Sequence, residues 1–162
     1  MEIVLAQSKD APVIHQVMLQ AFQEYEKATP PSSALSETVD SIEQAMQQSE
    51  QAFIGYIEKQ PVAMVRFTLS TKGIYFFRLS VIPERQGQGL AKTLISWLEQ
   101  YTLSKGITIS QCKVRMSVPR NIELYRSLGY VVTKEEMVKN RNGNSLVIAT
   151  MEKRLSNEEE FN

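Results

Sequence analysis

The feature that most constrains the fold is a strand, a glycine-rich turn and a helix that follow one another in the middle of the chain. Residues 74–82 form a nearly continuous apolar and aromatic run that Pro83 ends, the pattern of a central strand covered on both faces. Gly87 and Gly89 follow it. Apolar residues then recur at helical spacing, at Leu90, Leu94, Trp97, Leu98 and Tyr101. A strand that leads directly into an amphipathic helix predicts an α/β fold.

Hydrophobic patterns in the rest of the chain predict further elements on both sides of this unit. Pro12 follows Asp10 at the start of a helical pattern, and the Pro-Pro-Ser-Ser stretch at residues 30–33 ends it. A turn at residues 58–61 joins two strands, and Asn-Arg-Asn-Gly at residues 140–143 predicts a hairpin. The expected strands are residues 2–7, 52–57, 62–69, 74–82, 107–116, 130–139 and 145–153, and the expected helices begin near residues 11, 37, 90 and 119.

This order, β-α-α-β-β-β-α-β-α-β-β, predicts a mixed α/β domain with a mixed sheet over residues 1–155, followed by a polar tail at residues 156–162. A chain of 162 residues is long enough to bury a core without disulfides or metal. We therefore expect a single domain.

Charge and composition exclude several classes of function. Lys and Arg number 18 and Asp and Glu number 18, so no net charge attracts nucleic acid or an anionic membrane. One cysteine and one histidine provide no zinc cluster, and we expect no metal. No targeting pattern and no stretch of roughly twenty apolar residues is present, so we expect a cytoplasmic protein.

The glycine turn, residues 86–92, is a candidate anion site. Two glycines allow a sharp turn and leave backbone amides uncovered, and the helix that follows directs its first N–H groups and its dipole to the same place. A P-loop would need a glycine directly before Lys92, and a dinucleotide fingerprint would need a glycine in place of Lys92. Both alternatives fail on spacing, while a tight structural turn remains open.

Three segments resemble the GCN5-related N-acetyltransferase (GNAT) family. Gln-Gly-Gln-Gly-Leu-Ala at residues 86–91 is similar to the family's acyl-CoA pyrophosphate motif. Arg-Leu-Ser-Val-Ile-Pro-Glu at residues 78–84 resembles the strand before that motif, and residues 121–130 resemble the family's later Asn-x-x-Leu-Tyr helix and strand start. The expected element order also resembles that of the family over nearly the whole chain.

The resemblance implies a site for acetyl-CoA and a role for each matching residue. The strand around Leu79, Ser80 and Val81 would pair with the pantetheine arm, in a slot where two strands splay apart, and Tyr125 would place its hydroxyl near the thioester sulfur. The amides of the glycine turn would hold the pyrophosphate, and an asparagine side chain would hold the CoA chain. The cofactor-binding residues are therefore Leu79, Ser80, Val81, Gln86, Gly87, Gln88, Gly89, Leu90, Ala91, Lys92 and Asn121.

The reaction so implied is acetyl transfer from acetyl-CoA to a primary amine of a small molecule or peptide. The acceptor wall would come from the first two helices, the loop at residues 28–36 and the hairpin near residues 141–144, and a homodimer is possible. Tyr125 is the expected catalytic residue, because a thiolate leaving group benefits from a hydroxyl donor. The alternative is a non-catalytic module that binds acyl-CoA and acts as a sensor or regulator.

The sequence departs from the family at two places. Val118 stands where many members have an asparagine, which moves the expected CoA contact to Asn121. The central strand has no obvious general base, and the remaining candidates, Glu24, Glu26 and Glu37, read mainly as solvated carboxylates, so deprotonation through water is equally compatible.

Three further side chains can be interpreted from their positions in the predicted elements. His15 falls off the apolar stripe of the first helix, which predicts an exposed imidazole. Cys112 alternates with apolar residues on a strand, which predicts a buried, inert thiol. For Arg78 the sequence is compatible with two roles, a structural ion pair or a contact with substrate.

Overall fold

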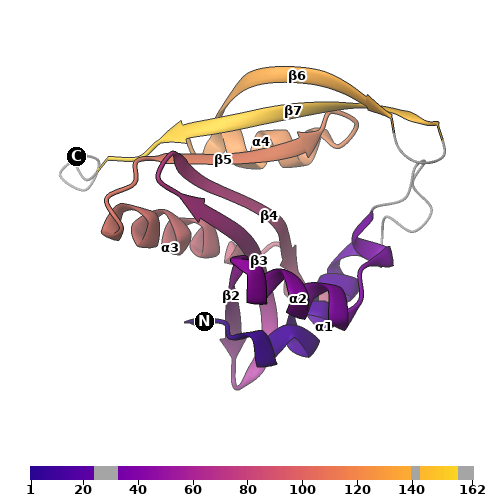
Figure 1. Cartoon of the computed structure of the whole chain (residues 1–162), viewed down its shortest axis with the longest axis vertical. Coiled ribbons are helices and arrows are strands. Elements are labelled where there is room, and N and C mark those ends of the chain that lie inside the picture. The colour runs from indigo at the N-terminus through magenta and orange to yellow at the C-terminus, as the bar shows by residue number, and fades with distance from the viewer. Residues whose placement is uncertain (24–32, 140–142, 157–162) are drawn as a thin grey trace. The chain divides into compact units, whose positions relative to one another are not determined.

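The computed structural model describes residues 1–23, 33–139 and 143–156 and has the predicted order of elements. A mixed sheet and helices make up the fold, so the α/β prediction is confirmed (Figure 1). The elements are β1 (Glu2–Leu5), α1 (Ala11–Phe22), α2 (Val39–Gln48), β2 (Gln51–Ile57), β3 (Gln60–Ser70), β4 (Gly73–Val81), α3 (Leu90–Ser104), β5 (Ile109–Arg115), α4 (Pro119–Ser127), β6 (Val131–Lys139) and β7 (Ser145–Arg154).

The chain forms two compact units, and β3, β4 and α3 each have one part in either unit. The first comprises Met1–Thr68 and Phe76–Leu98, and the second comprises Leu69–Tyr75 and Glu99–Asn162. In the first unit β1, β2 and β3 pair in order, β1 and β2 antiparallel and β2 and β3 antiparallel. In the second unit the start of β4 runs parallel to β5, and β7 lies between β5 and β6, antiparallel to both.

The core of the first unit lies between the two N-terminal helices and the sheet. Pro12 occupies the first turn of α1, where its missing N–H costs no hydrogen bond. Thr38 caps α2 and forms a reciprocal capping box with Ser41. The apolar faces of both helices pack on β2 and β3 through a set of fully buried side chains, Ala11, Ile14, Val17, Met18, Ala34, Ile42, Ala52, Ile54 and Met64.

The second unit has a buried polar centre within its apolar core. The Tyr130 hydroxyl donates to Glu99 Oε2 at 2.9 Å and lies 2.7 Å from Ser110 Oγ. Lys153 Nζ donates to Glu99 Oε1 at 3.1 Å. Burial and the Glu99 charge raise the pKa of Tyr130 well above its usual value, so this hydroxyl stays protonated and structural. No helix in the described part of the chain is long and apolar enough to cross a membrane.

Three expectations about local structure were wrong. Glu58 and Lys59 alone form the β2–β3 turn with φ of 51° and 67°, which is the two-residue geometry with both central residues left-handed, and Pro61 lies inside β3. The strand β4 is central in the sheet, as predicted, but the continuously buried run lies in β3, whereas buried and half-buried residues alternate in much of β4. Trp97 is 50% exposed, because it lies at the edge of the α3 stripe rather than on it. The prediction for residues 140–142 and most of the polar tail fall outside the described residues.

Candidate functional site

The end of β4 carries the first predicted site residues, Leu79, Ser80 and Val81, and it is kinked just before them. Arg78 has φ of 55°, the left-handed region that a non-glycine residue enters at a cost of roughly 1–2 kcal/mol. This conformation interrupts the regular pleat, as in a β-bulge. Leu79 and Val81 are half-buried, whereas Ser80 is buried and its Oγ donates to the Arg78 carbonyl at 2.8 Å. The kink therefore sets the direction of the backbone N–H groups that follow it.

The glycine turn lies between the short 3₁₀ turn Pro83–Arg85 and α3. Gly87 and Gly89 have φ of 79° and 78°, so both occupy the left-handed region that favours glycine. An added Cβ would meet no atom within 4 Å at either position. Both glycines are therefore required by backbone conformation and not by close packing.

Most backbone N–H groups of this turn have no hydrogen-bond partner in the described residues. The Gly89 carbonyl accepts from the Thr93 N–H at 3.1 Å, which closes the first turn of α3. Within the described residues, the N–H groups of residues 87–92 have no recorded acceptor. Unpaired amides at the start of a fifteen-residue helix combine hydrogen-bond donors with the positive end of the helix dipole. The structure thus places the predicted residues of this segment in one turn at the start of α3, a candidate anion site.

The other predicted site residues, Asn121 and Tyr125, belong to the second unit and share one face of α4 because they are one turn apart. Tyr125 is 7% exposed, and its ring packs edge-on against Tyr130 with 6.0 Å between centroids. Asn121 is half-buried, and its N–H donates to the carbonyl of Val118, which stands at the N-cap of α4. The Tyr125 hydroxyl is therefore carried by a ring that is held in place by packing.

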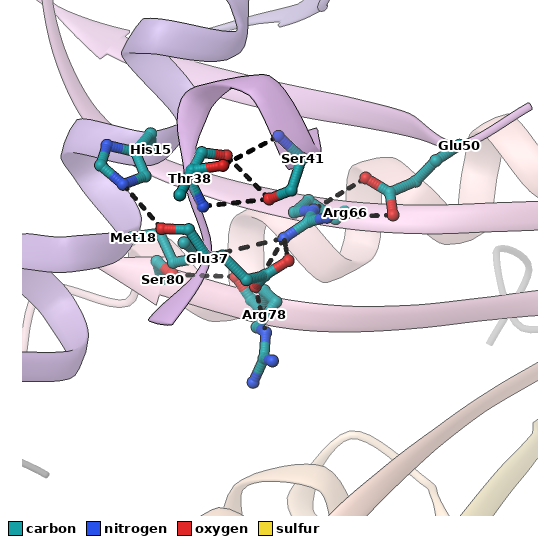
Figure 2. A network of polar contacts seen from close by, with 9 residues as sticks. All are labelled: His15, Met18, Glu37, Thr38, Ser41, Glu50, Arg66, Arg78 and Ser80. Atoms are coloured by element: carbon teal, nitrogen blue, oxygen red, sulfur yellow. Dashed lines mark hydrogen bonds and ion pairs between the residues drawn. The ribbon is translucent and has the colours of Figure 1, made fainter. Parts of the chain in front are cut away.

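Of the three candidate bases, Glu37 is described by the structure, while Glu24 and Glu26 lie outside the described residues. The expectation that Glu37 is a solvated carboxylate was wrong. Its side chain is 23% exposed and accepts from Arg66 Nη1 at 2.8 and 2.9 Å and from Arg78 Nε at 3.0 Å (Figure 2). Both oxygens are therefore committed to hydrogen bonds with guanidinium groups.

Arg66 is the centre of this cluster of Arg66, Arg78, Glu37 and Glu50, which we call the Arg66 network. The Arg66 side chain is 3% exposed and also donates to Glu50 through Nε at 2.8 Å and Nη2 at 3.1 Å. Burial by itself would lower the pKa of Arg66, but hydrogen bonds and charge from Glu50 and Glu37 outweigh it and raise that pKa. The guanidinium thus remains charged inside the protein.

Sequence reasoning missed the Arg66 network and the kink at Arg78. The signal for the network was an arginine inside the apolar run of residues 62–67, because a buried guanidinium needs carboxylate partners. No signal for the kink is visible, since arginine has no preference for the left-handed region. His15 was predicted to be exposed, but it is half-buried with Nε2 at 3.0 Å from the Glu37 carbonyl. Cys112 is buried, as predicted.

Comparison with known proteins gives the family. The family model described as "Acetyltransferase (GNAT) family" matches residues 18–130. None of the curated proteins compared with the chain matches it.

Solved structures share the fold at low sequence identity. A ribosomal-protein-S18-alanine N-acetyltransferase from Escherichia coli superposes with a TM-score of 0.78 at 19% identity, over 96% of this chain and 94% of that one. A ribosomal-protein-alanine N-acetyltransferase from Brucella melitensis gives 0.78 at 16% identity, over 96% and 100%. An aminoglycoside 6′-N-acetyltransferase complexed with coenzyme A gives 0.69 at 15% identity, over 95% and 97%. With the family model matching well over half of its length, the chain belongs to the acetyltransferase (GNAT) family.

Proposed function

We propose that the protein transfers an acetyl group from acetyl-CoA to a primary amine of a small molecule or peptide. The observation that carries the proposal is the glycine turn, where two left-handed glycines precede α3 and the N–H groups of residues 87–92 have no recorded acceptor in the described chain. A pyrophosphate supplies the negative charge and the oxygens that such a turn binds. A coenzyme A complex of a protein with the same fold supports this choice of ligand.

The strand before the turn would bind the rest of the cofactor. With the pyrophosphate on the turn, the pantetheine arm would run along Leu79 and Val81, which are half-buried at the end of β4. The proposal also includes the slot predicted from the sequence, in which two strands splay apart around the pantetheine arm. A backbone N–H near Val81 would then donate to the oxyanion that forms when the amine attacks the thioester carbonyl.

Tyr125 would act as the proton donor in the second half of the reaction. Collapse of the tetrahedral intermediate breaks the carbon–sulfur bond, and the departing thiolate takes a proton from the hydroxyl. The attacking amine must lose a proton, and water would accept it, because the carboxylate of Glu37 is committed to two arginines. Asn121, one turn before Tyr125, would hold the CoA chain on the same face of α4.

Titration calorimetry with coenzyme A and acetyl-CoA tests the cofactor site. We expect both to bind, and acetyl-CoA to be consumed when amines are added. The amine panel should include peptides with a free N-terminus, polyamines and aminoglycosides, because proteins of this fold carry names that refer to each kind of acceptor. Absence of binding for both thioester and free coenzyme would refute the proposal.

A second candidate is a module that binds acyl-CoA without turnover. The specific observation in its favour is the Arg66 network, which removes Glu37 from the candidate bases. Tight binding of acetyl-CoA with no release of free thiol across the amine panel would favour this candidate over the enzyme.

A further inference from the structure

We propose that Glu37 is a positioning residue that holds the kink of β4 at Arg78 and thereby orients the N–H groups of residues 79–81. The inference deepens the proposed function, because those groups are the ones that would face the pantetheine and the thioester. All of the residues that carry it belong to the first compact unit.

Two recorded contacts hold Arg78, one at its carbonyl and one at its guanidinium. Its carbonyl accepts from Ser80 Oγ at 2.8 Å, and its Nε donates to Glu37 Oε2 at 3.0 Å (Figure 2). The first contact comes from β4 itself, whereas the second comes from a residue more than forty positions earlier in the chain. A left-handed arginine in a strand is unfavourable by itself, so the surrounding contacts must stabilise it.

Glu37 is itself fixed from several sides. Its two oxygens receive Arg66 Nη1 at 2.8 and 2.9 Å, and Arg66 is anchored in turn by Glu50 and lies over the ring of Phe77 at 5.2 Å. The capping box that begins at Thr38 fixes the backbone directly after Glu37. The Glu37 carboxylate therefore has little freedom to move, and it presents Oε2 to Arg78 from a rigid support.

The charges of the Arg66 network favour a positioning role over ligand binding. Arg66 and Arg78 contribute two positive charges, and Glu37 and Glu50 contribute two negative charges, so the formal sum is zero. A neutral, mutually hydrogen-bonded group does not concentrate charged ligands as an uncompensated patch does. It does connect the start of α2 to the end of β4 through short, charge-assisted hydrogen bonds.

The test compares Glu37→Gln with Glu50→Gln. Both substitutions remove one carboxylate from Arg66, but only Glu37 contacts Arg78 among the recorded hydrogen bonds of the two acids. A glutamine at position 37 offers one oxygen and turns an amide N–H₂ toward a guanidinium donor. Arg78→Met keeps an unbranched side chain but removes the same contact from the other partner, and it serves if Glu37→Gln does not fold.

Backbone NMR of the protein without ligand is the first readout. We expect the amide resonances and hydrogen exchange of Leu79, Ser80 and Val81 to change clearly in Glu37→Gln and Arg78→Met, and to change much less in Glu50→Gln, which contacts Arg78 only through Arg66 and Glu37. Equal changes in both glutamine variants, or none in either, would overturn the inference. This readout does not depend on activity, so it stands even if the protein fails to acetylate any amine.

Turnover is the second readout. We expect Glu37→Gln to lower kcat by roughly ten- to a hundredfold, as displacement of a reacting group by about 1 Å does, with the acetyl-CoA dissociation constant changed much less. Glu50→Gln should keep kcat while losing thermal stability. If Glu37→Gln lost stability without a selective loss of kcat, the Arg66 network would have only a structural role, and the inference would be wrong.

Discussion

Cys112 is a residue whose chemistry is set entirely by burial. Its side chain is 2% exposed, and desolvation raises the pKa of the thiol to about 12. We expect the folded protein at pH 8 to react with iodoacetamide far more slowly than the protein unfolded in guanidinium chloride, because the thiolate is the nucleophile. Mass spectrometry of the labelled protein measures both rates, and rapid labelling under native conditions would contradict the burial.

The same shift has a consequence for stability against pH. The thiol pKa is raised from 9.0 in the reference state to about 12 in the folded state, so only the unfolded thiol ionises between those values. Its contribution to stability is therefore complete below pH 9 and is lost as the pH rises toward 12. The urea midpoints of unfolding of the native protein and of Cys112→Ala should therefore differ less at pH 10.5 than at pH 8.

Tyr125 is the residue on which the proposed chemistry depends. Tyr125→Phe keeps the ring that packs against Tyr130 and removes only the hydroxyl. We expect kcat to fall by roughly a hundredfold or more, the usual contribution of a positioned acid, with coenzyme A affinity nearly unchanged. Thiol release measured with acetyl-CoA and an accepted amine gives kcat, and calorimetry gives the affinity.

Tyr101→Phe is the matched control for that change, since it removes a hydroxyl from a half-buried tyrosine of α3 that is not assigned to the site. It should turn over like the native protein. An unaltered kcat in Tyr125→Phe would exclude the hydroxyl as the proton donor, but it would not argue against the proposed cofactor site.

At the scale of elements, the glycine turn and the end of α3 offer a controlled comparison. Gly89 and Gly106 have nearly the same φ, 78° and 76°, and neither has an atom within 4 Å of an added Cβ. Alanine at either position costs roughly 1–2 kcal/mol of conformational strain. Both variants should therefore lose similar stability in a urea titration.

Only Gly89→Ala should also weaken coenzyme A binding, by about tenfold if the strain is relieved by moving the amides away from the bound pyrophosphate. Gly106→Ala lies at the other end of the helix and should bind like the native protein. Equal affinities in the two variants would show that the turn does not hold the cofactor.

The elements themselves were largely predictable because each one is determined by local patterns. The helical pattern that begins at Pro12 placed α1, and the glycines before α3 located the turn. The β2–β3 turn was predicted two residues too long, because Glu58 and Lys59 have no local preference for the left-handed region and adopt it to match the twist of the paired strands. Pairing between the two adjacent strands, and not the preference of the turn residues, selected that geometry.

At the scale of the whole molecule, cofactor binding should raise the melting temperature. A ligand that binds only the folded state at about a hundred times its dissociation constant adds about 2.7 kcal/mol, which corresponds to roughly 5–10 °C for a chain of this size. Differential scanning fluorimetry with coenzyme A measures the shift. Gly89→Ala at the same coenzyme concentration should shift less, and no shift in the native protein would contradict the cofactor site.

What the sequence determined by itself is the family, the order of elements and the glycine turn, because each rests on residues that are close together in the chain. Only the tertiary structure decided that Glu37, Glu50 and Arg78 meet at the buried guanidinium of Arg66 and that Arg78 kinks β4. Pairing between charged groups far apart in sequence depends on which side chains the fold buries together. An arginine in an apolar run predicts that carboxylate partners are needed. Which carboxylates become its partners depends on how the helices pack on the sheet.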